Sequence, residues 1–323
     1  MELLFMSRDE SLNFSVAKSI AILVVVTGHY FGGIWWIPVT VALFVFAFSS
    51  AFFTTRKYSS NFNASKYWKA KVSRLAIRLS AINLFLFILF LLQNKPGIFT
   101  WQTLITLTGL SGFITWFNLP APSPFGRGMW FFTLLLIFYV TFPILLSSAK
   151  SKRSSHIFIA LSLALISLEY LQPMGHMLWL TTLAFLFGVY HASHYAPSKF
   201  TLSTVSLILA CTLLITANFV FHTKLFNIAL ILIISVFSIR FTLSFPFSTM
   251  LCKIPSLEPL MLEIYLIHPY LLLRNDNITP FITFPLSLLS IITASYLINR
   301  TTLVLTEKVM SLLGNGNRLR QNK

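Results

Sequence analysis

The sequence predicts an all-α protein, a multipass transmembrane bundle of about ten helices that forms one membrane domain over residues 1–323. Of the 323 residues, 56% are hydrophobic and only 10% are charged, which excludes an ordinary soluble globular domain. Apolar runs long enough to cross a bilayer recur along the chain. The 24 Lys and Arg residues outnumber the 8 Asp and Glu residues and gather between these runs, as is typical of cytoplasmic loops. We therefore expect membrane lipids, and no nucleic acid, among the partners.

The first apolar run, from Asn13 to Trp36, carries two ionisable side chains, Lys18 and His29. Eleven residues at about 100° each bring position 29 to within about 20° of position 18, so both lie on one helix face, about 16 Å apart along the axis. Ionisable groups at membrane depth often mark function. The alternative is a lysine that reaches the interface and a histidine bonded to a neighbouring helix. Because no small-residue cleavage site follows, we expect a retained helix rather than a signal peptide.

Nine further apolar runs are expected to cross the membrane, the first of them after a tight turn at Ile37–Pro38. They are expected near residues 38–55, 75–92, 129–146, 157–171, 176–190, 201–221, 225–241, 257–273 and 279–305. Several are short, which tilt and local thinning of the bilayer accommodate. The segment 98–119 is apolar but contains Gln102, Gly109 and Gly112. We interpret it as a re-entrant or surface-lying segment.

The basic residues predict the orientation. If both termini face the cytoplasm, the inner side carries most Lys and Arg residues, including the seven from Arg56 through Arg78. The outer side then carries only Lys95, Arg127, Lys224 and Arg274. This asymmetry favours cytoplasmic termini. It places Lys18 near the cytoplasmic end of the first span and His29 in the outer half.

The ninth expected span, residues 257–273, adds a second group of polar side chains. Tyr265 and His268 share a helix face because they are three residues apart, whereas Glu263 does not share that face with His268. Glu263 is expected at about the depth of Lys18, and an ion pair between the two would lower the cost of burying both charges. This pairing is the structural alternative to a functional role for Glu263.

Four segments in order along the chain resemble the acyltransferase 3 family of membrane proteins. The pattern of Lys18 and His29, K-x10-H, is similar to the R-x10-H first helix of that family. The others are the basic segment KAKVSRLAIRL (Lys69–Leu79), the run GMWFFTLLLIFYVTFPILL (Gly128–Leu146) and IYLIHP (Ile264–Pro269). Together they span most of the chain. We therefore expect an integral protein of the bacterial cytoplasmic (inner) membrane.

The resemblance implies transfer of an acyl group, most often acetyl, from cytoplasmic acyl-CoA to a hydroxyl of a surface polysaccharide or a lipid-linked glycan. Acetyl-CoA is then the expected donor, and no metal is expected. His29 is the candidate general base, because an imidazole titrates near neutral pH. His268 is the second catalytic candidate: it orients the acceptor or a water, or it only bridges helices.

The substrate-binding candidates serve the donor or the acceptor. Lys18 is expected near the polar part of CoA, and Arg74 and Arg78 near its phosphates, although both arginines also fit a purely topological role. On the acceptor side, Arg127 and Trp130 are expected at the outer mouth, where they touch a sugar by stacking or hydrogen bonding. Trp130 fits an anchor at the membrane interface equally well. Tyr265 and Glu263 complete the candidate substrate-binding set.

The sequence also departs from the family. Lys18 stands where the family usually has arginine, which removes bidentate recognition of phosphate. Glu263 stands where a small residue is usual, and no soluble hydrolase-like domain is expected after the last helix. A transporter or flippase for a glycan or lipid is the alternative function, because intramembrane His, Lys and Glu suit it too. The absence of repeated halves in the sequence argues against this alternative.

Two further residue pairs bear on metal or disulfide chemistry. His191 and His194 have a spacing that suits a metal, but no carboxylate or thiol cluster accompanies them, so we expect a solvated loop pair. Cys211 falls in an apolar run and Cys252 in a short loop, so we expect no disulfide.

Overall fold

A computed structural model describes residues 8–120, 123–175, 177–194, 224–244, 256–275 and 277–312. Within these ranges the chain forms eleven α-helices, two short 3-10 helices and no strand, which confirms the all-α prediction. The expected span at 201–221, Cys211 and Cys252 lie outside the described residues.

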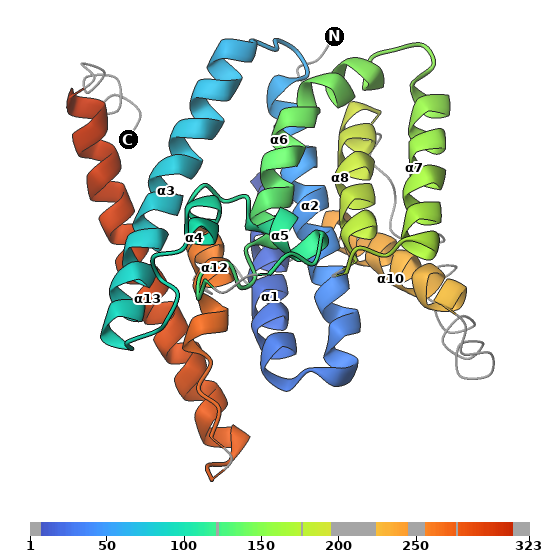
Figure 1. Cartoon of the computed structure of the whole chain (residues 1–323). Helices are drawn as coiled ribbons and strands as arrows, with labels where there is room; N and C mark the ends of the chain where they lie inside the picture. Colours follow the sequence, from blue (N-terminus) through green and yellow to red (C-terminus); the bar gives the residue numbers. More distant parts are fainter. Residues whose placement is uncertain are drawn as a thin grey trace. The chain divides into compact units, whose positions relative to one another are not determined.

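The helices lie close to the predicted apolar runs. Their bounds are α1 (Arg8–Phe31), α2 (Trp36–Tyr58), α3 (Ala64–Leu92), α4 (Trp101–Leu107), α5 (Ser111–Trp116), α6 (Trp130–Ala149), α7 (Ser154–Leu171), α8 (Leu178–Ser193), α10 (Lys224–Ser244), α12 (Met261–Leu271) and α13 (Pro280–Leu312) (Figure 1). Among the described residues, seven of these helices are long and apolar enough to cross a membrane: α1, α2, α3, α6, α7, α10 and α13. These helices agree with a multipass bundle.

The chain divides into two compact units, described separately below. The first unit comprises residues 1–63 and 134–258, and the second comprises residues 64–133 and 259–323. The first therefore holds α1, α2, α7, α8, α10 and most of α6. The second holds α3, α4, α5, α12 and α13.

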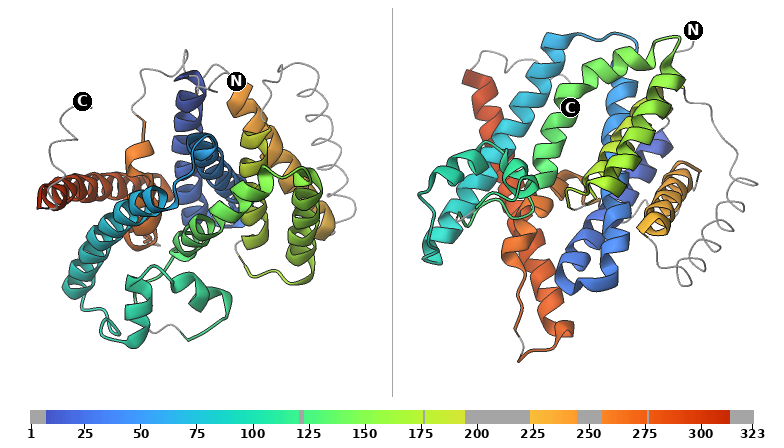
Figure 2. Two further views of the ribbon diagram at one scale, coloured as in Figure 1. Left: turned by 90° about the horizontal axis from the view of Figure 1, so that it is seen from above. Right: turned by 45° about the vertical axis from the view of Figure 1, so that its right-hand side comes forward.

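In the first unit α2 is the central helix. It packs against α1, α8 and α10, while α7 packs against α8 (Figures 1 and 2). Phe14, Phe48 and Phe52 are fully buried and stack on one another, with ring centroids 5.6–6.1 Å apart. At Gly188 an added Cβ would lie 2.5 Å from the backbone oxygen of Phe48, so α8 and α2 approach too closely for any larger side chain. Buried aromatic area and close backbone contact hold this unit together.

The turn between the first two helices lies earlier than predicted. Gly32 and Gly33 have φ angles of 68° and 57°, and α1 ends at Phe31 just before them. Only glycine adopts this left-handed conformation without steric cost, so the pair terminates α1. The predicted turn at Ile37–Pro38 is wrong. Pro38 lies in the first turn of α2, where its missing N–H has no helical partner to lose.

In the second unit α3, α12 and α13 pack together. Between α3 and α6, α4 and α5 contain only 7 and 6 residues, too few to cross a bilayer. This confirms that segment 98–119 does not span. The Thr133 hydroxyl holds this segment in place, because it donates a hydrogen bond to the Gly109 carbonyl (2.7 Å) and accepts one from the Gly112 N–H (2.8 Å).

The expected span at 257–273 is not one continuous helix. A 3-10 turn covers Glu258–Leu260 and α12 covers Met261–Leu271, a rise of about 16 Å for 11 residues. The backbone is extended at Leu272 (ψ 113°), and Pro259 lies in the 3-10 turn before the helix. Proline favours such an element boundary, because it lacks an N–H and restricts the preceding residue. The prediction of a full crossing by this helix alone is therefore wrong.

Candidate functional site

Lys18 and His29 both lie in α1, which continues without a break from Arg8 to Phe31. The predicted geometry is therefore confirmed: the two residues share one helix face and are about 16 Å apart along the axis. One face of α1 thus presents a cation in its first half and an imidazole in its last turn.

The surroundings of His29 come from the tight α1–α2 hairpin. The His29 ring is half-buried and meets the Trp36 ring edge-on, with centroids 5.0 Å apart. One residue earlier, a Cβ at Gly28 would lie 2.1 Å from Cγ2 of Val39. The hairpin therefore closes tightly only with glycine at position 28, and this contact sets the position of the imidazole.

Lys18 does not take the partner that the sequence suggested. Its ammonium forms an ion pair with Glu258, inside the first unit. Ser15 and Ser19 hold the adjoining segment to α1: the Ser15 hydroxyl lies 2.6 Å from that of Ser256, and the Leu257 N–H donates to the Ser19 hydroxyl. The predicted Lys18–Glu263 pair is thus replaced by Lys18–Glu258.

Glu263 has its own partners in the second unit. Its side chain is fully buried, with Oε1 3.7 Å from Nε of Arg78 and 3.4 Å from the Asn299 amide nitrogen, which donates to it. Oε2 has no hydrogen-bond partner among the described residues. Arg78 and Asn299 therefore compensate the buried carboxylate in part. The structure brings together two predicted substrate-binding residues, Arg78 and Glu263, whereas Arg74 is exposed.

His268 is fully buried on the same short helix. Its Nδ1 lies 2.7 Å from the Tyr265 carbonyl oxygen, and a carbonyl can only accept a hydrogen bond. Nδ1 is therefore the protonated nitrogen, and in the neutral ring Nε2 carries the lone pair. Tyr265 is also buried, and its ring packs 5.1 Å from that of Phe131. Chemically, His268 is oriented to accept a proton or a hydrogen bond at Nε2.

Trp130 lies beside Phe131 at the start of α6 and is only 4% exposed. An interfacial anchor presents its ring to the headgroup region, so that interpretation of Trp130 is wrong. Contact with a bound sugar remains a proposal.

The sequence indicated Arg127 as a possible sugar contact, but it did not reveal the polar cavity of about 620 Å³ that Arg127 lines in the second unit. Gln102, Ser111, Arg127 and Tyr270 contribute to its wall. The available signal was the unusual polarity of segment 98–119, which supplies the first two of these residues.

His191 and His194 are not a solvated loop pair. His191 lies in α8 and packs against the rings of Phe48 and Phe52, with centroids 5.9 and 6.0 Å away. His194 is exposed and lies within 3.3 Å of the Ser154 hydroxyl. Within the ranges that the structure describes, no three His, Cys, Asp or Glu side chains form a group suited to a metal ion.

The chain was compared with protein families, curated proteins and solved structures. Residues 12–300 match the acyltransferase 3 family model, described as an acyltransferase domain. The match covers all eight candidate residues predicted from the sequence. No curated protein and no solved structure matches the chain.

Proposed function

Because the chain belongs to the acyltransferase 3 family and is an integral multipass membrane protein, we propose that it transfers an acetyl group from cytoplasmic acetyl-CoA to a hydroxyl of a surface or lipid-linked glycan. Acyltransferase activity in a membrane follows from the family. The donor, the acceptor and the direction of transfer are the proposal. The family match includes parts of both compact units, and we propose that they act as one acyltransferase domain.

The observation that supports this function most directly is the face of α1 that carries Lys18 and His29. Acyl transfer needs a base within hydrogen-bond reach of the acceptor hydroxyl, and a cation that contacts the polar part of the donor favours donor binding. The distance along α1 between these residues, about 16 Å, leaves room for an extended pantetheine arm between the CoA phosphates and the thioester. The half-buried ring of His29 is reachable and yet held by the hairpin.

The chemical step is a direct transfer. His29 takes the proton of the acceptor hydroxyl as its oxygen attacks the thioester carbonyl carbon. The C–S bond breaks, a C–O ester bond forms, and CoA leaves as a thiolate that takes up the proton held by the imidazolium or one from solvent. General-base assistance of this kind contributes about 10²–10⁴-fold to the rate. The products are the O-acetylated glycan and free CoA.

The donor side of the proposal uses the basic residues. Lys18 contacts the polar part of CoA, and in the free protein Glu258 balances its charge. Arg74 is exposed on α3 and available to a phosphate, whereas Arg78 is partly committed to Glu263. Of the two arginines, Arg74 is therefore the better phosphate ligand.

The acceptor side of the proposal uses residues of the second unit. His268 presents Nε2 as an acceptor and orients the sugar hydroxyl or a water. Tyr265, Glu263 and Trp130 shape the surroundings of the acceptor. We propose the bacterial cytoplasmic (inner) membrane as the location, with both termini in the cytoplasm, because the basic loops favour that orientation.

Labelled acetyl-CoA tests the function. Purified protein in lipid nanodiscs is incubated with acetyl-CoA carrying a labelled acetyl group, and free CoA is measured with a thiol reagent. We expect slow CoA release with water as acceptor and faster release with glycan, accompanied by label on the glycan. A transporter or flippase would release no CoA above the protein-free control, and that result would contradict the proposal.

A further inference from the structure

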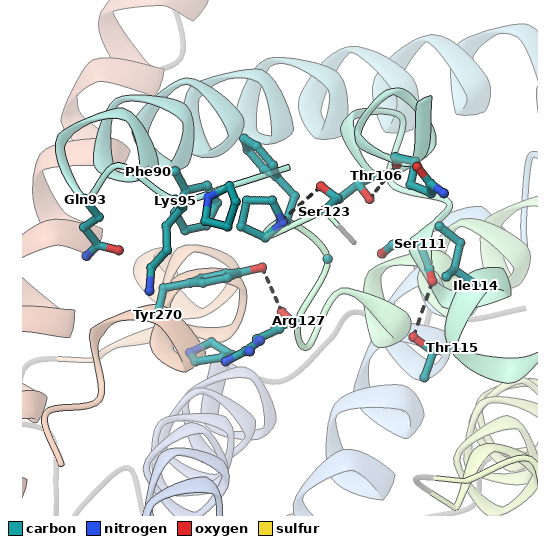
Figure 3. A pocket seen from close by; sticks show the side chains of 16 residues that line it. Phe90, Gln93, Lys95, Thr106, Ser111, Ile114, Thr115, Ser123, Arg127 and Tyr270 are labelled. Carbon is teal, nitrogen blue, oxygen red and sulfur yellow. Dashed lines mark hydrogen bonds between the residues drawn. The ribbon is translucent and has the colours of Figure 1, made fainter. Parts of the chain in front are cut away.

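The second unit contains a polar cavity between the end of α3, the α4–α5 segment, the loop before α6 and the end of α12 (Figure 3). Its volume of about 620 Å³ is within the range of small-molecule sites. Two aromatic rings, Phe90 and Tyr270, pack 5.3 Å apart on its wall. The cavity therefore combines an aromatic surface with polar groups, as sugar sites require.

Two cations line the cavity, Lys95 and Arg127. None of the described lining residues is Asp or Glu, and neither cation forms an ion pair with a described carboxylate. Gly126 and Gly128 flank Arg127 with φ angles of 100° and 75°, so the loop that carries Arg127 depends on glycine conformations. The Tyr270 hydroxyl donates to the Arg127 carbonyl over 3.4 Å and ties this loop to α12.

Several hydroxyl groups lie away from the cations. Figure 3 shows Lys95, Tyr270 and Arg127 toward one side and Thr106, Ser111 and Thr115 toward the other. Ser111 is 3% exposed, and its Oγ has no hydrogen-bond partner among the described residues. An unpartnered buried hydroxyl is costly unless a ligand or water completes it. The cavity thus presents positive charge on one side and an unsatisfied hydroxyl on the other.

We propose that this cavity binds an anionic sugar, which is the acyl acceptor if the function proposed above is right. The carboxylate or phosphate of the sugar meets Lys95 and Arg127, and its hydroxyls meet Ser111 and neighbouring hydroxyl and amide groups. The predicted orientation places both cations on the outer side of the membrane, where such acceptors are found. Pro269 and Tyr270 line the cavity directly after His268, so the sugar lies next to a candidate catalytic helix.

Binding is measured by isothermal titration calorimetry on the full chain in phosphatidylcholine nanodiscs, because sugar detergents would compete. The probes are methyl glucuronide, glucose 1-phosphate and neutral methyl glucoside. We expect at least one anionic probe to bind about tenfold more tightly than methyl glucoside, with a preference that weakens in salt. The two anionic probes show whether the site prefers a carboxylate or a phosphate.

Substitutions locate the site. Arg127→Gln and Lys95→Gln should each abolish most of the preference for the anionic probe, with little change in the binding of methyl glucoside. Ser111→Ala should weaken both classes of probe. Arg274→Gln removes an exposed cation of the same unit that does not line the cavity, and it should bind like the wild type. Circular dichroism and thermal melting identify any variant that has not folded.

Equal binding of anionic and neutral probes, or a preference that survives both cation substitutions, would overturn the inference. It would also be overturned if nanodiscs with added phosphatidylglycerol bound the lipid at these residues while no sugar bound. The two proposals fail separately. If the protein releases CoA but shows no preference for anionic probes, the proposed acyltransferase function stands and the proposed acceptor site is wrong. If anionic sugars bind but no CoA is released, the sugar site stands and its role as the acceptor site is wrong.

Discussion

Lys18 forms an ion pair with Glu258, which lies 240 residues later in the chain. The Lys18 side chain is 15% exposed and that of Glu258 is 43% exposed, so water partly screens the pair. Such a pair contributes less than about 1 kcal/mol to stability. A ligand phosphate can displace a half-exposed carboxylate more easily than a buried one, so the pair with Glu258 leaves the Lys18 ammonium available to a ligand.

Substitution of Lys18 separates donor binding from stability. Lys18→Arg should retain activity, because it keeps the charge and adds hydrogen-bonding capacity. Lys18→Met should weaken acetyl-CoA binding with little change in melting temperature. The Lys18→Met, Glu258→Gln double variant should remain weak for acetyl-CoA, and Glu258→Gln alone should bind it normally. A stable Lys18→Met protein with unchanged donor affinity would remove Lys18 from donor recognition.

Arg78 and Arg74 lie one helical turn apart and should behave differently. Arg78→Met leaves the fully buried Glu263 carboxylate without its cation, which should destabilise the protein by about 1–3 kcal/mol, discounted because Arg78 is 26% exposed. Adding Glu263→Gln should restore the melting temperature. Arg74→Met should leave the melting temperature unchanged and should raise the KM for acetyl-CoA. If Arg78→Met melted like the wild type, the ion pair with Glu263 would have no structural importance.

Gly28 controls the hairpin that positions His29. In Gly28→Ala the new Cβ would meet Cγ2 of Val39 at 2.1 Å, and overpacking of this kind costs about 1–3 kcal/mol. We expect lower stability and lower transfer activity. Gly28→Ala, Val39→Ala removes the clashing methyl and should recover both, since the remaining contacts of the new Cβ are 3.4 Å or longer. A single variant with normal stability and transfer would show that the hairpin tolerates a wider spacing.

The orientation is tested with single cysteines in a variant lacking the two native cysteines. Ser60→Cys lies in the exposed connection between α2 and α3 and should resist an impermeant thiol reagent in intact cells. Asn277→Cys, exposed between α12 and α13, should be labelled. Lysed cells provide the control, where both should react. The reverse pattern would invert the topology and the side assigned to Lys95 and Arg127.

The sequence predicts most of the helices, because a long apolar run in a membrane satisfies its backbone hydrogen bonds by forming a helix. The residues at which helices begin and end are harder to predict. Pro38 suggested a turn that Gly32 and Gly33 make instead, since proline is accepted in the first turn of a helix. For the helix after Pro259, the length of the apolar run did not reveal that α12 stops at Leu271.

The candidate site is predictable along a helix and less so between helices. Periodicity is sufficient to place Lys18 and His29 on one face of α1. It gives the depth of Glu263 but not the neighbouring helices, so the sequence suggested Lys18 as its partner, whereas the structure has Arg78. The cavity that contains Ser111 forms only when the fold brings four parts of the chain together, and no local sequence pattern predicts that.

The role of the two histidines is the central claim, and single-turnover transfer from labelled acetyl-CoA to glycan tests it most directly. His29→Ala should bind acetyl-CoA and fold normally, while transfer falls by about 10²–10⁴-fold. His268→Gln, measured alongside, keeps hydrogen bonding without a basic nitrogen and shows whether a second base is needed. Near-normal transfer by a well-folded His29→Ala protein would contradict the account.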